Sequence, residues 1–478
     1  MIKKILIVAS LSISLVMQSQ NHADLNSAFS ILTGFDDTST NNNIPVRSLA
    51  VQADGKILVA GSFYTLQGSA QNRIVRLNTD GSIDTTFNVG TGFDSTVYKI
   101  ELQSDGKIVA VGVFNFFNGS PKSYIIRLNT DGSIDSTLDV GNGFDGLLFG
   151  LAIQNDGKIL VSGFYTNFQN ATQRYLIRLN SNGSKDASFN IGSGFDNSVS
   201  QIVVQNDGKI LVGGVYTIFN GNTQNNLVRL NSDGSKDTTF NIGTGFNYIV
   251  NSIQIQTDSK ILVGGSFSTF QGVSQKYLVR LNPDGSKDPT FDIGTGFDDN
   301  VNSLFLQSNG QVLVGGSFST YKGISQKKLI RLNSNGLKDT SFDIGSGFGG
   351  SPFTYNYGIT SIKVLNNGAT IIGGKFTNYQ GISNTRDLVL LKGNPLSFQS
   401  FDKLDFKIYP NPSENYINIT NTKNLKIDFI EIYDLQGKIL KKQTESSTTI
   451  DVSDLQKGMY LLKITSENNL SNQLFIKK

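Results

Sequence analysis

The pattern of hydrophobic and polar positions repeats along most of this chain with a period of 51 residues. Short apolar runs alternate with Asp-Gly turns, and no part of the repeat has the spacing of an amphipathic helix. Three registers carry the period: the arginines Arg76, Arg127, Arg178, Arg229, Arg280 and Arg331, the aspartates Asp84, Asp135, Asp186, Asp237, Asp288 and Asp339, and the aromatics Phe63, Phe114, Tyr165, Tyr216, Phe267 and Phe318. The period predicts an array of similar structural units.

Each unit divides into four predicted strands. In the second unit these are residues 97–103, 107–114, 124–129 and a fourth around 135–140. The second strand is almost continuously apolar, as expected for a strand covered on both faces. Repeated four-stranded units of about 50 residues are typical of propeller blades. A β-solenoid is the main alternative, although its coils usually repeat at shorter periods.

The number of units predicts how the array closes. The Asp-Gly-Lys turn recurs at Gly55, Gly106, Gly157, Gly208, Ser259, Gly310 and Gly368, but only six fourth strands follow these turns. Residues 24–36 match the missing segment, with Phe29 aligned to Phe87 and Gly34 to Gly92. The sequence therefore predicts a seven-bladed β-propeller of four-stranded blades over residues 24–393, closed by the N-terminal strand so that no sheet edge stays exposed.

The recurring arginine and aspartate give a test of this closure. They are eight residues apart across a turn, which makes them cross-strand neighbours. The seventh unit has Leu390 in place of the arginine, and the N-terminal segment has Asn26 in place of the aspartate. We therefore expect residues 24–36 to pair with residues 388–391, with Asn26 near Leu390. As exposed ion pairs, the other six would each contribute only about 0–1 kcal/mol.

The period ends at a linker, residues 394–405, and a different pattern of strands follows. This pattern predicts a small immunoglobulin-like β-sandwich over residues 406–478. The expected strands are residues 406–409, 416–420, 429–434, 438–442, 448–452, 459–465 and 473–477.

Specific motifs relate both parts of the chain to known families. The tail contains Tyr409, Pro410, Asn411 and Pro412, then Gly437 within an Asp-Leu-Gln-Gly-Lys segment, then Gly458 and Tyr460, and it ends in Lys477 and Lys478. With these motifs it resembles the type A sorting domain of the type IX secretion system of Bacteroidetes. The resemblance implies transport across the outer membrane, removal of the tail, and then release or surface attachment, with the secretion machinery as partner. An ordinary immunoglobulin-like binding module is the alternative. The repeats resemble the delta-60 type of bacterial propeller repeat, which implies the fold and no particular activity.

The N-terminus reads as an export signal. Lys3 and Lys4 precede a 13-residue apolar run, residues 5–17, which is shorter than the roughly 20 residues of a spanning helix. Residues 1–20 are therefore predicted to be a signal peptide, cleaved within about residues 19–23. With the sorting tail, this predicts a protein that is secreted or held on the outer-membrane surface after export to the periplasm.

Composition limits the available chemistry. Charged residues are 17% of the chain and the net charge is +3, so a basic surface for nucleic acid is not expected. There is no cysteine, which excludes disulfides and thiolate metal sites. The one histidine, His22, lies at the edge of the export signal. No cofactor, metal site or catalytic residue is predicted.

Two repeated motifs have a structural and a functional interpretation. The turn that includes Asn78, Asp80, Gly81 and Asp84 could suggest calcium, but it lacks the ligand spacing of an EF-type loop, so a structural hairpin is favoured. The Gly90-Thr91-Gly92 segment could suggest phosphate binding, but it precedes no helix and recurs in every unit, so a turn is favoured.

A single ligand requires residues that break the repeat, and two insertions do so. Residues 37–44 and 349–358 each lengthen the connection into a first strand, and they should flank the seventh blade. The candidate ligand-binding residues are Phe353, Tyr355, Tyr357, Asn41, Asn42 and Asn43. Aromatic and amide groups suit a glycan or protein ligand. The leading hypothesis is a monomeric, non-enzymatic binding scaffold; a carbohydrate-active enzyme that uses carboxylates and a purely structural envelope module are the alternatives.

Overall fold

The computed structural model describes residues 23–36, 45–350, 358–392, 406–421, 427–433, 439–443, 448–466 and 469–478. The chain divides into two compact units, Met1–Asn394 and Pro395–Lys478. The described residues form β-structure throughout, apart from one 3₁₀ turn, η1 (Ser383–Thr385). They include no helix with the length and apolar character needed to cross a membrane. The predicted signal peptide and the 394–405 linker lie outside the described residues.

The first unit contains, among its described residues, seven three-stranded antiparallel sheets, each built from one repeat with the second strand in the middle. Their strands are β2 (Val46–Val51), β3 (Ile57–Gly61) and β6 (Ile74–Leu77); β7 (Val97–Leu102), β8 (Ile108–Gly112) and β11 (Ile125–Leu128); β12 (Leu147–Ile153), β13 (Ile159–Phe164) and β16 (Leu176–Leu179); β17 (Val199–Val204), β18 (Ile210–Gly214) and β21 (Leu227–Leu230); β22 (Val250–Ile255), β23 (Ile261–Gly265) and β26 (Leu278–Leu281); β27 (Val301–Leu306), β28 (Val312–Gly316) and β31 (Leu329–Leu332); β32 (Gly358–Val364), β33 (Thr370–Lys375) and β34 (Leu388–Leu391).

A short hairpin connects the second and third strands in six of these repeats. The hairpin strands are β4 (Thr65–Leu66) and β5 (Ser69–Ala70), β9 (Phe116–Phe117) and β10 (Ser120–Pro121), β14 (Asn167–Phe168) and β15 (Ala171–Thr172), β19 (Ile218–Phe219) and β20 (Asn222–Thr223), β24 (Thr269–Phe270) and β25 (Val273–Ser274), and β29 (Thr320–Tyr321) and β30 (Ile324–Ser325). The turn η1 takes this place in the last repeat.

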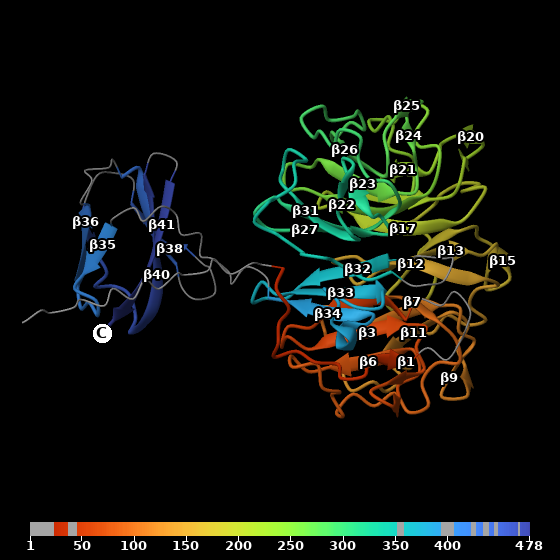
Figure 1. The fold of residues 1–478 in the computed structure, drawn as a ribbon, viewed down its shortest axis with the longest axis horizontal. Coiled ribbons are helices and arrows are strands. Elements are labelled where there is room, and N and C mark those ends of the chain that lie inside the picture. Colours follow the sequence, from red (N-terminus) through yellow and green to blue (C-terminus); the bar gives the residue numbers. More distant parts are fainter. Residues whose placement is uncertain are drawn as a thin grey trace, which may run out of the picture. The chain divides into compact units, whose positions relative to one another are not determined.

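The sheets form a closed ring. Each first strand contacts the first strand of the next repeat, and β32 contacts β2, so the last repeat meets the first (Figure 1). The Thr360 hydroxyl on β32 donates a hydrogen bond of 2.6 Å to the Val46 carbonyl on β2. An apolar cluster fills each of the seven spaces between described neighbouring sheets. Because both faces of every sheet are covered, the central strands are apolar at nearly every position.

The predicted fourth strand is wrong in detail, because this segment is not a regular strand. It makes one bridge to the third strand of its own repeat, such as Leu128 with Ile134. The Asp135 carboxylate then accepts hydrogen bonds from the backbone and hydroxyl of Thr137, which turns the chain. Gly141 and Gly143 follow with positive φ angles of 57° and 65°, which glycine adopts without strain. The segment crosses to the next sheet and does not extend its own.

The N-terminal segment makes this crossing between the last sheet and the first. The Asn26 amide donates to the Leu390 carbonyl at 2.9 Å, as predicted from the sequence, and Leu25 forms a bridge with Leu391. Its other end pairs with the first repeat, where β1 (Phe35–Asp36) joins β4. The Phe35 ring lies 4.6 Å from the Phe63 ring. The termini of the ring are therefore tied together by backbone pairing and by apolar packing.

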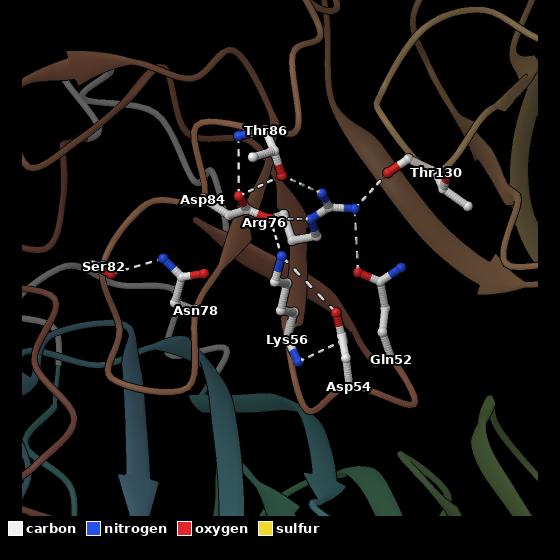
Figure 2. Close-up of polar contacts among 9 residues, drawn as sticks. All are labelled: Gln52, Asp54, Lys56, Arg76, Asn78, Ser82, Asp84, Thr86 and Thr130. Carbon is white, nitrogen blue, oxygen red and sulfur yellow. Dashed lines mark hydrogen bonds and ion pairs between the residues drawn. The ribbon is translucent and has the colours of Figure 1, made fainter.

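The recurring arginine and aspartate form a buried network. Arg76 and Asp84 are 7% and 5% exposed, so the prediction of exposed pairs is wrong. Figure 2 shows the Arg76 guanidinium between Asp84, at 2.7 Å, and the Thr130 carbonyl of the next repeat. The Lys56 ammonium lies 2.9 Å from the same carboxylate. Four other arginines donate the equivalent hydrogen bond to a backbone carbonyl of the next repeat: Arg127 to Ser181, Arg178 to Ser232, Arg229 to Pro283 and Arg280 to Ser334.

The network sets the charge state of its carboxylates. Burial by itself raises the pKa of Asp84, but hydrogen bonds from Thr86, Lys56 and Arg76 outweigh burial and hold this pKa well below its usual range. Their contribution to stability is therefore present at neutral pH and is lost only as the pH falls below about 4. The joint between the last and first repeats lacks all three charges, because Leu390, Asn26 and Ala369 occupy the positions of the arginine, aspartate and lysine.

We predict that Arg229→Leu lowers the free energy of unfolding by on the order of 3 kcal/mol, because it removes the buried cation of the ion pair with the Asp237 carboxylate. The triple variant Arg229→Leu, Asp237→Asn, Lys209→Ala reproduces the uncharged joint and should recover most of this loss. Urea unfolding followed by circular dichroism measures both. Lys236→Gln, at an exposed lysine, is the control. A triple variant as unstable as the single one would contradict this account.

One repeat has a gap in its packing. Phe87, Phe189, Phe240, Phe291 and Phe342 each lie under the network arginine of their repeat, at 4.6–4.8 Å. The second repeat has Leu138 there, and a pocket of about 300 Å³ lies beside it and Arg127.

Leu138→Phe should therefore stabilise the protein by about 0.5–2 kcal/mol, since the ring fills the pocket and covers the guanidinium. Thermal unfolding of this variant, compared with Phe240→Leu as the reverse change, provides the measurement. A lower melting temperature for Leu138→Phe would show that the pocket is not available to the ring.

The second unit has, in its described part, two antiparallel sheets around one apolar core. The predicted strands are present, with ends that agree or differ by one to four residues. The strands are β35 (Phe406–Tyr409), β36 (Tyr416–Asn421) and β39 (Thr449–Asp451) in one sheet, and β38 (Ile439–Gln443), β37 (Phe429–Tyr433), β40 (Gly458–Ser466) and β41 (Asn469–Lys477) in the other.

Candidate functional site

A β-bulge interrupts every first strand of the ring at the same place. The pairing of each first strand with the second skips one residue, so that this residue has no partner across the sheet. The bulge residues are Arg47, Tyr98, Phe149, Ser200, Asn251, Asn302 and Thr360. Bulges re-aim side chains and are common beside binding sites. The seven bulges form one layer around the centre of the ring.

Three consecutive bulge residues carry large side chains that contact one another. The Arg47 guanidinium lies over the Tyr98 ring, 4.1 Å from its centroid. The Tyr98 ring meets the Phe149 ring edge to face, with centroids 5.0 Å apart. Such contacts contribute roughly 0.5–1.5 kcal/mol beyond area burial. Arg47, Tyr98 and Phe149 therefore form a cationic and aromatic side of the ring centre.

The remaining bulge residues are small and polar. The Asn251 amide donates to the Val301 carbonyl and to the Asn302 side chain, both at 3.3 Å. Ser200 makes the corresponding bond to the Val250 carbonyl at 3.4 Å. These bonds connect adjacent first strands and leave amide and hydroxyl groups half-exposed at the centre. This side of the ring can exchange hydrogen bonds with a polar ligand.

The bulge layer opens into a cavity along the axis of the ring, called the tunnel below. It has a volume of about 740 Å³ and is lined by residues of all seven first strands. Pockets that bind small molecules usually have about 300–1,000 Å³ and are lined by apolar and aromatic groups with a few polar ones. The tunnel therefore has the size and composition of a small-molecule site.

Charge in the tunnel is concentrated on the first strands of the first, second and seventh repeats. Lys99 and Glu101 on β7 form an ion pair of 3.4 Å. Lys363 on β32 faces the same region. Burial lowers the pKa of Lys363, and the like charge of Lys99 lowers it further, while Glu101 acts in the opposite direction. An additional negative group here would relieve this repulsion.

One position of the repeat varies strongly in residue type, and this variation marks the tunnel in the sequence. The residue before each bulge is a valine, leucine or isoleucine in every repeat, whereas the bulge residue ranges from arginine to serine. Alignment of the repeats by position would have identified this variable register. The tunnel residues break the repeat by substitution and not by length, so the lengths of the repeats do not reveal them.

The predicted ligand-binding residues of the two insertions, Asn41, Asn42, Asn43, Phe353, Tyr355 and Tyr357, lie outside the described residues. The described chain does place the ends of both insertions. They lead into β2 and β32, which contact each other, so they join the ring at adjacent first strands. The strand starts are also nearest the bulge layer, with Pro45 two residues before Arg47 and Gly358 two before Thr360.

A buried carboxylate lies at the joint between the last and first repeats. Asp387 directly precedes β34 and is 1% exposed. Its carboxylate accepts a hydrogen bond from the Phe376 amide at 3.2 Å and pairs with Arg386 at 3.1 Å. Burial outweighs these contacts and raises the pKa of Asp387 to about 7.

This raised pKa predicts a joint that weakens as the pH rises. The folded state binds the Asp387 proton more tightly than the unfolded state, so its contribution is complete below about pH 4 and is lost by about pH 7. Asp387→Asn should remove this dependence and stabilise the protein near pH 7.5 by up to a few kcal/mol. Urea unfolding from pH 4.5 to 8 measures it, with Asp156→Asn at an exposed turn as control. Equal pH dependence in both variants would contradict it.

The described motifs of the tail come together although they are far apart in sequence. The Asn411 side chain accepts a hydrogen bond from the Ile476 amide at 3.0 Å, next to Lys477 and Lys478. The Tyr460 hydroxyl donates to the Gln456 carbonyl at 2.7 Å, and its ring stacks 5.5 Å from that of Phe475. Gly458 pairs with Lys477 across β40 and β41. On either side of Asn411 in the sequence are Tyr409, Pro410 and Pro412. Gly437 lies outside the described residues.

Family models match both parts of the chain. Residues 407–478 match the secretion system C-terminal sorting domain. Six segments match a domain of unknown function (DUF5122) beta-propeller, at residues 52–87, 103–138, 154–189, 205–240, 256–291 and 307–342. The chain is a repeat β-propeller with a secretion sorting domain. The family resemblances of the tail and of the repeats are confirmed, and the sorting domain implies export by type IX secretion to the cell surface or beyond.

Several solved structures are similar to the propeller chain. One is PorZ, a bacterial surface component of the type-IX secretion system of Porphyromonas gingivalis, with 12% identity and a TM-score of 0.42, over 93% of this chain and 60% of that one. This chain thus spans less than two thirds of PorZ. Another is virginiamycin B lyase from Staphylococcus aureus, with 15% identity and a TM-score of 0.40, over 74% and 96%. A third is a gluconolactonase from Xanthomonas campestris, with 11% identity and a TM-score of 0.33, over 70% and 95%. No curated protein matches the chain.

Proposed function

We propose that this protein is an exported binding protein whose propeller holds a small ligand, such as a glycan, in its central tunnel. In this proposal a signal peptide takes the chain to the periplasm, and the immunoglobulin-like tail directs it through type IX secretion to the outer-membrane surface or the medium. The propeller has seven blades, closed by the N-terminal segment, and acts as a monomer. One observation carries the proposal: the bulge layer is the place where the repeat loses its symmetry.

Asymmetry at the bulge layer argues for a ligand and against a purely structural role. The stability of the ring comes from positions that repeat, such as the buried networks and the apolar clusters between sheets. The bulge side chains are half-exposed and add little to those clusters. A chain selected only for rigidity has no physical need for an arginine, two aromatics and two asparagines at one equivalent position.

The lining also favours binding over hydrolysis. Most glycosidases need two carboxyl groups that flank the scissile bond. Among the described residues, the tunnel lining contains a single carboxylate, Glu101, and it is paired with Lys99. An aromatic face for the apolar side of a sugar ring, with amides for its hydroxyls, suits recognition without chemistry. The aromatic and asparagine residues of the two insertions, which join the ring at β2 and β32, would extend this surface at the mouth of the tunnel.

The repeat itself supplies variants that should fold. Phe149→Ser introduces the residue that Ser200 holds in the next repeat, and it should weaken binding of a tunnel ligand at least tenfold by removing the aromatic face. The matched control is Phe116→Thr, at an exposed phenylalanine of β9 whose equivalents include Thr65 and Thr269. Calorimetric titration of glycans and peptides identified by thermal shift measures both affinities.

The outcome distinguishes the sites. A ligand whose affinity falls with Phe116→Thr but not with Phe149→Ser binds the outer rim, and the tunnel proposal is then wrong. Joint replacement of Phe353, Tyr355 and Tyr357 by alanine tests the insertions separately. A loss confined to that variant would place the ligand at the mouth and not inside.

A further inference from the structure

The tunnel has more positive than negative charge. The part of its lining that the structure describes includes Arg47, Lys99 and Lys363 but one carboxylate, Glu101. Among the described residues, this lining therefore has more cationic than anionic side chains, and charges interact more strongly inside a cavity than in open solvent. All four groups come from β32, β2 and β7, which are consecutive around the ring.

Lys363 is the cation whose environment most needs a negative partner. It makes no hydrogen bond or ion pair with any described residue, whereas Lys99 is held by Glu101. The strand between them, β2, carries the small and buried Ala50 at the position equivalent to Lys363. Lys363 and the Lys99–Glu101 pair all line the tunnel, and β2 places no charged side chain between them at this position.

The charged group and the aromatic group are within reach of one ligand. Lys363 lies three residues beyond its bulge residue along the strand, about 10 Å at the usual rise. Lys99 directly follows its bulge residue, Tyr98, so the two lysines lie at different depths beyond the layer that holds the Phe149 ring. A ligand that carries a ring at one end and an anionic group at the other would contact both.

We propose that the tunnel binds an acidic sugar, with its carboxylate or sulfate between Lys363 and Lys99. The proposal rests on the binding function proposed above and adds the class of ligand. Phe149 packs against the apolar face of a sugar ring. The amides of Asn251 and Asn302 face the hydroxyl groups. Glu101 keeps Lys99 in place and, through its own charge, limits the affinity for the anion.

Glu101 allows a test in which a substitution is expected to raise the affinity for the acidic sugar and not to lower it. Glu101→Gln, which introduces the residue of Gln254 in the equivalent position, removes a negative charge next to the anion site. It should tighten binding of an acidic sugar by threefold or more and leave a neutral sugar unaffected. Lys363→Ala, as in Ala50, and Lys99→Ser, as in Ser48, should each weaken the acidic sugar at least tenfold.

The experiment is calorimetric titration of the mature chain with three oligosaccharide series: galacturonic acid, sulfated galactose and neutral galactose. Affinity for at least one acidic series should exceed that for neutral galactose tenfold and should fall as sodium chloride is raised. The two acidic series show whether carboxylate or sulfate is preferred. Lys236→Gln is the matched control, since it removes a surface charge of the same sign. Circular dichroism melting confirms that each variant is folded.

Two results would overturn the proposal and are distinguishable from failure of the binding function. If neutral and acidic sugars bind equally and Lys363→Ala has no effect, the preference for acidic sugars is disproved. The tunnel would still be a site that binds sugars. If none of the three series binds, but some other ligand binds and its binding is lost in Phe149→Ser, acidic sugars are disproved as ligands. The proposal of a ligand-binding tunnel then stands. If no ligand responds to Phe149→Ser, both proposals fail.

Discussion

The constraint on which this structure depends is that every sheet of the ring must have both faces covered. The middle strand of each sheet is apolar and buried at nearly every position, so a sheet at an open end of the array would expose a large apolar face. A ring satisfies the constraint because it has no end. The chain therefore needs a segment between its last sheet and its first, and residues 23–36 supply it through Asn26, Leu25 and Phe35.

The charge networks show how the constraint is met in two ways. In the first five repeats, the arginine pairs with the aspartate of its own repeat and reaches a carbonyl of the next, so one side chain fixes the spacing of two sheets. At the joint, where the partners come from opposite ends of the chain, Leu390, Ala369 and Asn26 replace the charges. An apolar joint avoids the several kcal/mol cost of burying a charge whose partner has not yet arrived. Asp387, next to β34, is a buried titratable group of the last repeat, and burial raises its pKa.

Much of the ring could be predicted from the sequence because the period repeats the same evidence many times. The first three strands of each repeat and the pairing of Asn26 with Leu390 followed from alternation and alignment. The fourth segment could not, because the Asp135 side chain competes for the backbone and turns it. Burial of Arg76 was also missed, since its partner, the Thr130 carbonyl, lies in the next repeat. The tunnel was missed because a bulge depends on register, which one strand does not reveal.

The bulges explain how a repeat ring can acquire one asymmetric site without loss of stability. Paired residues such as Leu49 and Ile100 face an apolar cluster, where a change to arginine or asparagine would bury an unmatched polar group. A bulge residue has no partner across the sheet, so its side chain can differ from repeat to repeat at little cost. Seven equal side chains would offer a ligand seven equal orientations. Arg47, Tyr98 and Phe149 on one side, with Asn251 and Asn302 on the other, remove that degeneracy, so a ligand in the tunnel would have one preferred orientation.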